Sequence, residues 1–367
     1  MKKTLIVIIS LISVFYFISC ETSNEPAQGL EDEIYVMADS TEYSELLVAL
    51  DSTFEKIIYT PQPEKLFTLF RFSPNQLERY KNKKNILIVA PLNSESLTSR
   101  FIHSSVDSAA INKIVQQQDF IIKKDNLWAR NQLVMILTAP TIGELEYKIL
   151  NNKDNLLYAF QKASDKRLEE SLYNSRYEQE PLEGKLLKEY GWLIYVQADF
   201  KLAIDAPKDN FVWLRRSPGS DMERWIFIHW IDNASPAYLN EDSVRAIRNR
   251  MTKKYYRTTD DSAYVVIASD YYTSNAVNFH GRYAIFTQGL WELNIKGMGG
   301  PFINYTFFDE KTNRLYMLDG SLYAPKYYKR NLIQQMDVLL QSFLTESQVS
   351  KEKREELINA AKDYKKE

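Results

Sequence analysis

The chain contains a single cysteine, Cys20, and this one residue restricts the kinds of fold that are available. One thiol cannot form a disulfide within the chain, and it cannot supply a cysteine-based metal site. Stability must therefore come from the burial of apolar side chains. Hydrophobic residues make up 45% of the 367 positions, which is enough for a sizeable core and excludes a fully disordered or collagen-like chain. At roughly 100–200 residues per domain, this length predicts two or three domains.

The position of Cys20, directly after an apolar N-terminal segment, is also informative. Lys2 and Lys3 precede an almost continuous apolar segment, residues 5–18, which is shorter than the roughly 20 residues that a membrane-spanning helix needs. A charged start, a short apolar segment and a small residue before the break are typical of a signal peptide. We therefore predict a signal peptide over residues 1–19. An ordinary secretory signal and a buried free cysteine are the alternatives at this point.

Residues 17–20 (FISC) resemble the processing site of a bacterial lipoprotein signal, with Phe17 where that class usually has leucine. The resemblance implies that a diacylglyceryl group is attached to Cys20, that the chain is cut before this residue, and that the new amine is acylated, for example with palmitate. Stable anchoring needs about two acyl chains, which such a cysteine would carry. Residues 20–32 are polar and form the expected acylated tether. The expected location is the outer membrane, with the protein body facing the periplasm or the cell surface.

The charge balance limits the partners. The chain has 46 basic and 48 acidic residues, so it has no general excess of positive charge for binding polyanions. We therefore expect no nucleic-acid partner. The expected partners are the membrane, through the N-terminal lipid, and an envelope glycan or protein.

Strand-like and helix-like apolar patterns alternate along the chain. The continuous apolar run at residues 85–89 predicts a strand buried on both faces, and residues 43–57 have helical spacing. Residues 302–308 and 314–319 predict a hairpin, and residues 327–344 an amphipathic helix. This mixed order predicts an α+β fold with antiparallel or mixed sheets rather than one doubly wound parallel sheet.

The same patterns predict two subdomains of similar element content. We place an N-terminal α+β subdomain at residues 33–178 and a C-terminal α+β subdomain at residues 179–346. A charged tail at residues 347–367 follows, for which we expect a solvated helix or partial disorder.

Several sequence strings together resemble one protein family. They are NILIV at 85–89, WARNQLV at 128–134, NFVWLRR at 210–216, GLWELNIKGMGGPF at 289–302 and LYMLDGSLYAPKYYKR at 315–330. The chain resembles an uncharacterised lipoprotein family of Bacteroidetes-type bacteria that is known only as a domain of unknown function. The resemblance extends over the mature chain to about residue 343 and implies an envelope lipoprotein. It implies no catalytic residue.

Familiar catalytic motifs are missing from the sequence. It contains no G-x-S-x-G, H-E-x-x-H, P-loop or G-x-G-x-x-G string, and we predict no catalytic residue, no cofactor and no metal site. Of the three histidines, His280 is the most interesting because it lies in a polar loop before a predicted strand. A triad of His280 with Asp270 or Asp319 and a serine is an open alternative.

Glycines gather in one stretch of the chain. Gly297, Gly299 and Gly300 follow Trp291 and Glu292, in a chain that has only 11 glycines in all. Such a backbone could bring N–H groups together around a ligand, or it could allow close approach of another strand. Together with His280 and Arg282, these residues are the candidate binding residues.

These observations predict an envelope lipoprotein with a non-catalytic binding or structural role. The alternative is an envelope hydrolase that acts on a glycan or peptidoglycan-type polymer. Convergence of His280, Arg282, Trp291 and Asp319 in one pocket would favour the enzyme.

Overall fold

The computed structural model describes residues 25–58, 60–295 and 297–364. The predicted signal peptide, Cys20 and the first part of the predicted tether lie outside the described residues, as do the last three residues of the tail. Within the described ranges, no helix combines the length and the hydrophobicity that crossing a membrane requires.

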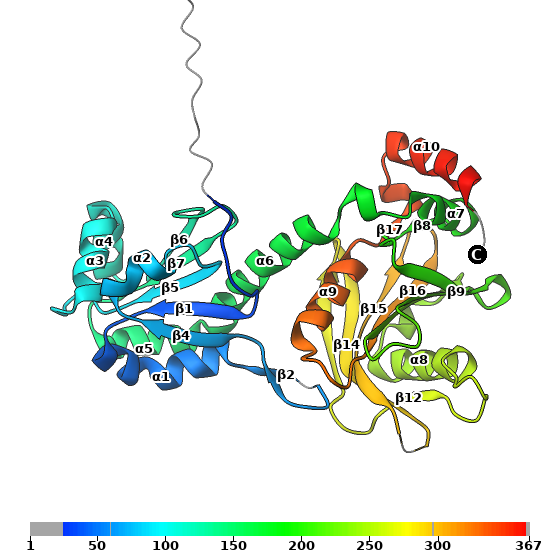
Figure 1. Cartoon of the computed structure of the whole chain (residues 1–367), viewed down its shortest axis with the longest axis horizontal. Coiled ribbons are helices and arrows are strands. Elements are labelled where there is room, and N and C mark those ends of the chain that lie inside the picture. The colour runs from blue at the N-terminus through cyan, green and yellow to red at the C-terminus, as the bar shows by residue number, and fades with distance from the viewer. Residues whose placement is uncertain (1–24, 59, 296, 365–367) are drawn as a thin grey trace, which may run out of the picture.

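The first half of the chain forms a five-stranded sheet (Figure 1). Its strands, in spatial order, are β4 (Thr68–Phe72), β1 (Glu33–Met37), β5 (Asn85–Val89), β7 (Leu133–Leu137) and β6 (Ile121–Asp125). Four strands are parallel and β6 is antiparallel to β7, so the sheet is mixed.

Helices cover both faces of this sheet. One face packs against α1 (Ser40–Phe54), α5 (Ile142–Asn151) and α6 (Lys153–Leu172). The other packs against α2 (Leu77–Tyr80), α3 (Leu97–Ser105) and α4 (Ser108–Val115). All five residues of β5 are therefore buried, which confirms the strand predicted from its continuous apolar run.

The second half forms an eight-stranded antiparallel sheet. The main path runs through β12 (Val265–Ile267), β14 (Arg282–Leu293), β15 (Gly299–Asp309), β16 (Arg314–Tyr323), β11 (Glu223–Asp232), β10 (Phe211–Arg216) and β9 (Phe200–Ala206). The eighth strand, β13 (Thr273–Phe279), pairs with β14. One mixed and one antiparallel sheet, with helices throughout, make the protein α+β, as predicted.

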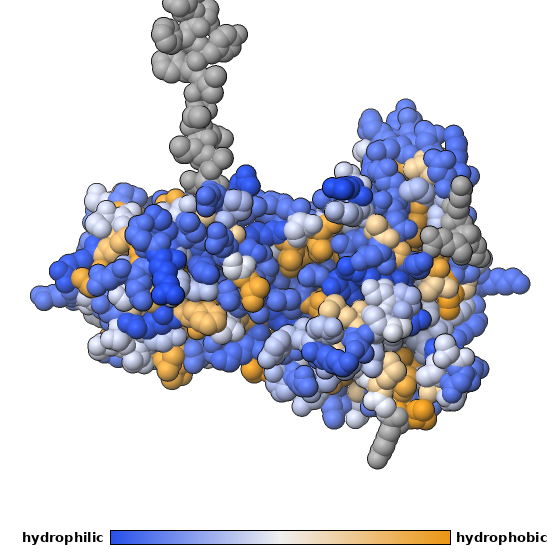
Figure 2. Space-filling model, in the orientation of Figure 1, coloured by the Kyte–Doolittle hydropathy of each residue, from blue (hydrophilic) through white to orange (hydrophobic). Residues whose placement is uncertain are grey.

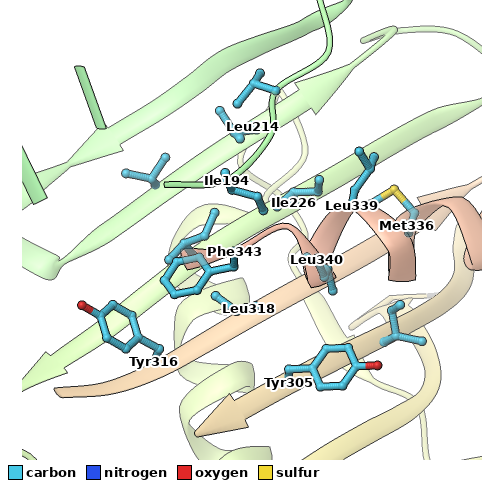
Figure 3. Close-up of a cluster of buried hydrophobic side chains, with 14 of the residues drawn as sticks. Ile194, Leu214, Ile226, Tyr305, Tyr316, Leu318, Met336, Leu339, Leu340 and Phe343 are labelled. Atoms are coloured by element: carbon cyan, nitrogen blue, oxygen red, sulfur yellow. The ribbon is translucent and has the colours of Figure 1, made fainter. Parts of the chain in front are cut away.

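Two cores lie on opposite faces of the second sheet. On one face, α7 (Glu180–Tyr190) and α9 (Arg330–Gln341) contribute apolar side chains. Figure 3 shows Met336, Leu339 and Leu340 of α9 beside Ile226 and Leu318 of the sheet. On the other face, α8 (Glu241–Tyr255) packs against Trp291 and its neighbours.

Short elements complete the fold. They are the hairpin of β2 (Ile57–Ile58) and β3 (Glu64–Lys65), the pair β8 (Trp192–Leu193) and β17 (Leu344–Thr345), and α10 (Lys351–Ala360). The α10 helix is the centre of the predicted charged tail. It packs against α7 through Leu357, which is fully buried. The helix expected for this charged segment is therefore present and mostly exposed, and one apolar side chain anchors it to the body.

A correction concerns the polar stretch before residue 282. The sequence predicted a loop there, but residues 273–279 form β13 and pair with β14 over their full length. This edge strand is largely solvent-accessible, so its side chains lack the hydrophobic alternation on which the strand prediction depends.

The β2–β3 hairpin of the first half contacts α9 of the second. The Glu64 carboxylate accepts hydrogen bonds from the backbone N–H groups of Lys329 and Arg330 at 2.7–2.9 Å. It thereby satisfies donors at the start of α9, where the helix dipole favours a negative charge. The Arg330 guanidinium in turn donates to the Leu66 carbonyl and lies over the Phe67 ring. These contacts join the two halves.

Candidate functional site

A groove of about 1790 Å³ lies between the two halves of the chain. Its walls come from the β2–β3 hairpin and α6 on one side, and from β13, β14, β15 and α9 on the other. Elements that are distant in sequence therefore meet along it. The visible molecular face in Figure 2 is mostly hydrophilic, with hydrophobic side chains in small separate patches.

Carboxylates from both halves line this groove, among them Asp165 on α6 and Asp337 on α9. The Tyr305 hydroxyl donates to Asp337 Oδ1 at 2.7 Å, and Gln341 Nε2 donates to the Tyr305 oxygen at 2.9 Å. Gln334 Nε2 donates to Asp165 Oδ1 at 2.6 Å. Each carboxylate is thus held in place by a neutral donor rather than by a cation.

Burial changes the acidity of both groups. Removal from water raises the pKa of Asp337 to about 6, and the charge of Asp165 raises it further. Burial also raises the pKa of Asp165 above its ordinary value. The groove therefore holds a carboxyl group that exchanges its proton close to neutral pH.

Aromatic rings form much of the remaining wall. Tyr173 and Tyr195 lie with their ring centroids 4.9 Å apart, and Phe286 lies 4.8 Å from Tyr305. Tyr158 and Tyr271 line the groove with exposed side chains. Tyrosines of this kind offer a flat apolar face together with a hydroxyl for hydrogen bonding.

Of the candidate residues, His280 lies along this groove. It occupies the tight turn between β13 and β14 in a left-handed backbone conformation, with φ of 51°. Its Nε2 is 2.7 Å from the carbonyl oxygen of Gln341 on α9. The histidine thus links the hairpin to the helix that carries Asp337.

Arg282 and Trp291 point elsewhere. The Arg282 guanidinium pairs with Asp309 at 2.8 Å and donates to the side chain of Gln348 at 2.8 Å. Trp291 is buried, and its Nε1 donates to the Leu322 carbonyl at 3.0 Å. Both residues hold strands and the C-terminal segment together.

The glycine-rich stretch lies where strands approach each other closely. A Cβ on Gly300 would stand 2.0 Å from the Leu322 carbonyl oxygen, and one on Gly299 would stand 2.9 Å from the Trp291 oxygen. Gly297 is the one with positive φ, at 154°, while Glu292 is exposed at the end of β14. These contacts agree with the alternative in which the glycines allow close approach of another strand. The assignment of these residues to a binding site stays a prediction.

The four residues chosen to discriminate between binding and catalysis do not converge. Asp319 is fully buried, pairs with Arg248 at 2.6 Å and accepts further bonds from Asn304 and Ser321. His280 bonds to a backbone carbonyl instead. The His280–Asp319 alternative is therefore not assembled in this structure.

A second histidine, His229, is buried inside the fold. His229 Nδ1 is 2.9 Å from the Asn210 carbonyl, and burial lowers the pKa of His229 to about 4. Within the described ranges, no group of three or more histidine, aspartate, glutamate or cysteine side chains could hold a metal ion.

Sequence reasoning missed the groove carboxylates. Asp337 lies in the run MDVLL, on a helix whose neighbouring positions are buried. A carboxylate inside an apolar run was the available signal, because such a group is seldom buried without a partner. Asp165 had no comparable signal, since charged residues surround it in sequence.

Comparison with known proteins places two family models on the chain. Residues 27–173 match a domain of unknown function, DUF8532, and residues 178–342 match a second one, DUF4837. The comparison with curated proteins gives no match.

Solved structures give only distant similarity. The Ran-binding protein Mog1p of Saccharomyces cerevisiae and a mutant of Mog1 each share 9% identity and a TM-score of 0.29, covering 42% of this chain and 90% of theirs. A Bacteroides thetaiotaomicron structure shares 6% identity and a TM-score of 0.23, covering 42% of this chain and 45% of its own. Scores this low support no inference about function. The two matches together cover most of the chain, which is therefore similar, as its resemblance implied, to domains of unknown function, DUF8532 in its first half and DUF4837 in its second.

Proposed function

We propose that this protein is a cell-envelope lipoprotein, anchored by acylated Cys20, that binds an envelope glycan in the groove between its two halves. The observation that carries the binding role is the groove itself, lined by tyrosines and by carboxylate and amide side chains. Sugars present apolar ring faces and hydroxyl groups, and this combination of side chains complements both. The anchor rests on the sequence around Cys20.

The experiment is a binding assay with solubilised peptidoglycan fragments as the probe. Asn275 lines the groove from β13 and is exposed, so Asn275→Trp places a large side chain in the groove. Ala276 is its exposed neighbour, points to the opposite face of the strand and does not line the groove. We expect Asn275→Trp to reduce binding at least tenfold and Ala276→Trp to leave it unchanged. Equal binding by both variants would refute the groove as the site.

A hydrolase that acts on a glycan is the second candidate. It is favoured by one observation, the pKa of about 6 for Asp337 in the groove, because glycosidases use a carboxylic acid of raised pKa as the general acid. Release of soluble sugar fragments by the wild-type protein, abolished by Asp337→Asn, would support hydrolysis. Stable binding without fragment release would support the binding module.

The anchor is tested separately. Cys20→Ala removes the only thiol, so no lipid can be attached. We expect this variant to be found as an unprocessed form or as a soluble one. A processed Cys20→Ala protein that still separates entirely with membranes would contradict the lipid anchor.

A further inference from the structure

A recess on the first half of the chain combines aromatic rings with cations. Tyr35 of β1 stands opposite Phe70 of the edge strand β4, and their rings stack at 5.4 Å. Tyr80 of α2 packs 5.4 Å from Tyr35. Phe70 is 41% exposed, which is high for a phenylalanine. The recess measures about 560 Å³.

Three cations surround these rings. Lys83 Nζ lies 4.7 Å from the Tyr35 ring, the Arg79 guanidinium lies 5.4 Å from the Tyr80 ring, and Arg71 lines the same recess. No described carboxylate lies within salt-bridge distance of any of the three. The Glu33 carboxylate, which accepts from the Tyr35 hydroxyl at 3.3 Å, lies nearby and offsets part of this charge. With three cations among its lining residues, the recess still carries net positive charge, on a chain whose acidic residues outnumber its basic ones.

The recess also lies beside the segment that leads back to Cys20. The Gln28 N–H donates to the Asn82 carbonyl, and the Lys84 N–H donates to the Gln28 carbonyl. The chain is bound to the body from Glu25 onward, where the Glu25 carbonyl accepts from the Arg130 N–H. Four residues separate Glu25 from Cys20, so the five steps between these two Cα atoms span at most about 18 Å. An acylated Cys20 would thus hold this end of the first half near a bilayer.

We infer that the recess of Tyr35, Phe70, Arg71, Arg79, Tyr80 and Lys83 is a docking surface for anionic lipid headgroups. This inference rests on the lipid anchor of the proposed function. A lipid phosphate is attracted by the cations, at roughly 1 kcal/mol for each basic residue near an anionic membrane. Tyrosine rings are favoured at the level of the headgroups, where one end is apolar and the other wet. Docking here would turn the first half towards the bilayer.

The test uses the acylated protein in two kinds of vesicle, phosphatidylcholine alone and phosphatidylcholine mixed with phosphatidylglycerol. The reporter is the rate at which a water-soluble amine reagent labels Lys83, with exposed Lys311 on the second half as the internal reference. We expect Lys83 to be labelled severalfold more slowly in the anionic vesicles, with Lys311 unchanged. Added salt should reduce the difference because it screens the attraction.

Matched variants separate local docking from net charge. Arg79→Glu and Lys351→Glu each reverse one exposed helical charge, the first in the recess and the second on α10. We expect Arg79→Glu to abolish the protection of Lys83 and Lys351→Glu to preserve it. Flotation with both kinds of vesicle but equal labelling of Lys83 would overturn the docking surface alone. Failure to float with either would overturn the anchor, and the docking surface with it. Protection of Lys83 by soluble peptidoglycan fragments instead of anionic vesicles would also overturn it.

Discussion

Single side chains in this protein are tuned by burial more than by ion pairing, and Asp337 is the clearest example. Its pKa is raised from 3.8 to about 6, chiefly by burial. The folded state therefore holds the proton more tightly than the unfolded state does. The resulting stability is fully present below about pH 4 and is lost as the pH rises through 6. Asp337→Asn should remove this loss and stabilise the protein at pH 7 by up to about 3 kcal/mol.

Denaturant unfolding of both proteins between pH 4 and 8 checks this expectation. The amide can still accept the Tyr305 hydrogen bond, so the variant retains the local geometry. Asp270→Asn, at an exposed carboxylate outside the groove, is the control and should run parallel to the wild type. If the free energy of unfolding of wild type and of Asp337→Asn differed by the same amount at every pH, the raised pKa of Asp337 would be wrong.

The packing of strands and helices determines which glycines can be replaced by a residue with a Cβ. Gly300 lies where β15 approaches β16, and a Cβ there would meet the Leu322 carbonyl oxygen at 2.0 Å. Gly300→Ala should therefore destabilise the protein by about 2–3 kcal/mol, because backbone must move to admit the methyl group. Thermal unfolding with its enthalpy gives this difference.

Gly143 provides the matched comparison within a helix. It lies in α5, and nothing stands within 4 Å of the position that its Cβ would take. Gly143→Ala should stabilise the protein by about 0.5–1 kcal/mol, since alanine loses less entropy on entering a helix. If Gly300→Ala were equally harmless, the close strand approach could not be the reason for that glycine.

At the scale of the whole molecule, Glu64 makes one of the contacts that join the two halves. Glu64 accepts three hydrogen bonds at the start of α9 and is almost fully buried. Glu64→Ala should destabilise the protein by about 2 kcal/mol, because it removes a helix cap and leaves buried N–H groups without an acceptor. It should also loosen the halves, so that limited proteolysis cuts between them sooner.

Lys65→Ala is the control for this expectation. Lys65 is an exposed neighbour in the same hairpin and pairs with Glu55 of the same half. Exposed ion pairs contribute about 0–1 kcal/mol, so little change is expected. Equal proteolysis rates for Glu64→Ala and the wild type would show that the cap does not hold the halves together.

Local patterns along the chain were sufficient to predict the α+β class, the buried strand at residues 85–89 and the amphipathic helix that the structure has at residues 330–341. Each depends on the spacing of apolar residues over a few turns or pleats. The same reasoning failed at β13, where an edge strand lacks that spacing. It predicted the charged C-terminal helix correctly, but not the packing of that helix through a single buried leucine. The location of the protein and its lipid anchor stay predictions.

The groove could not be derived from such patterns. Asp165 and Asp337 come from different halves, and their separation depends on how α6 and α9 pack against each other. The raised pKa of Asp337 comes chiefly from burial, and Asp165, which lies far away in sequence, raises it further. Periodicity reports which face of an element is buried, but it does not report which other element covers that face. Composition and spacing therefore determined the elements and the class of fold, whereas the groove and its acidity were decided by long-range packing alone.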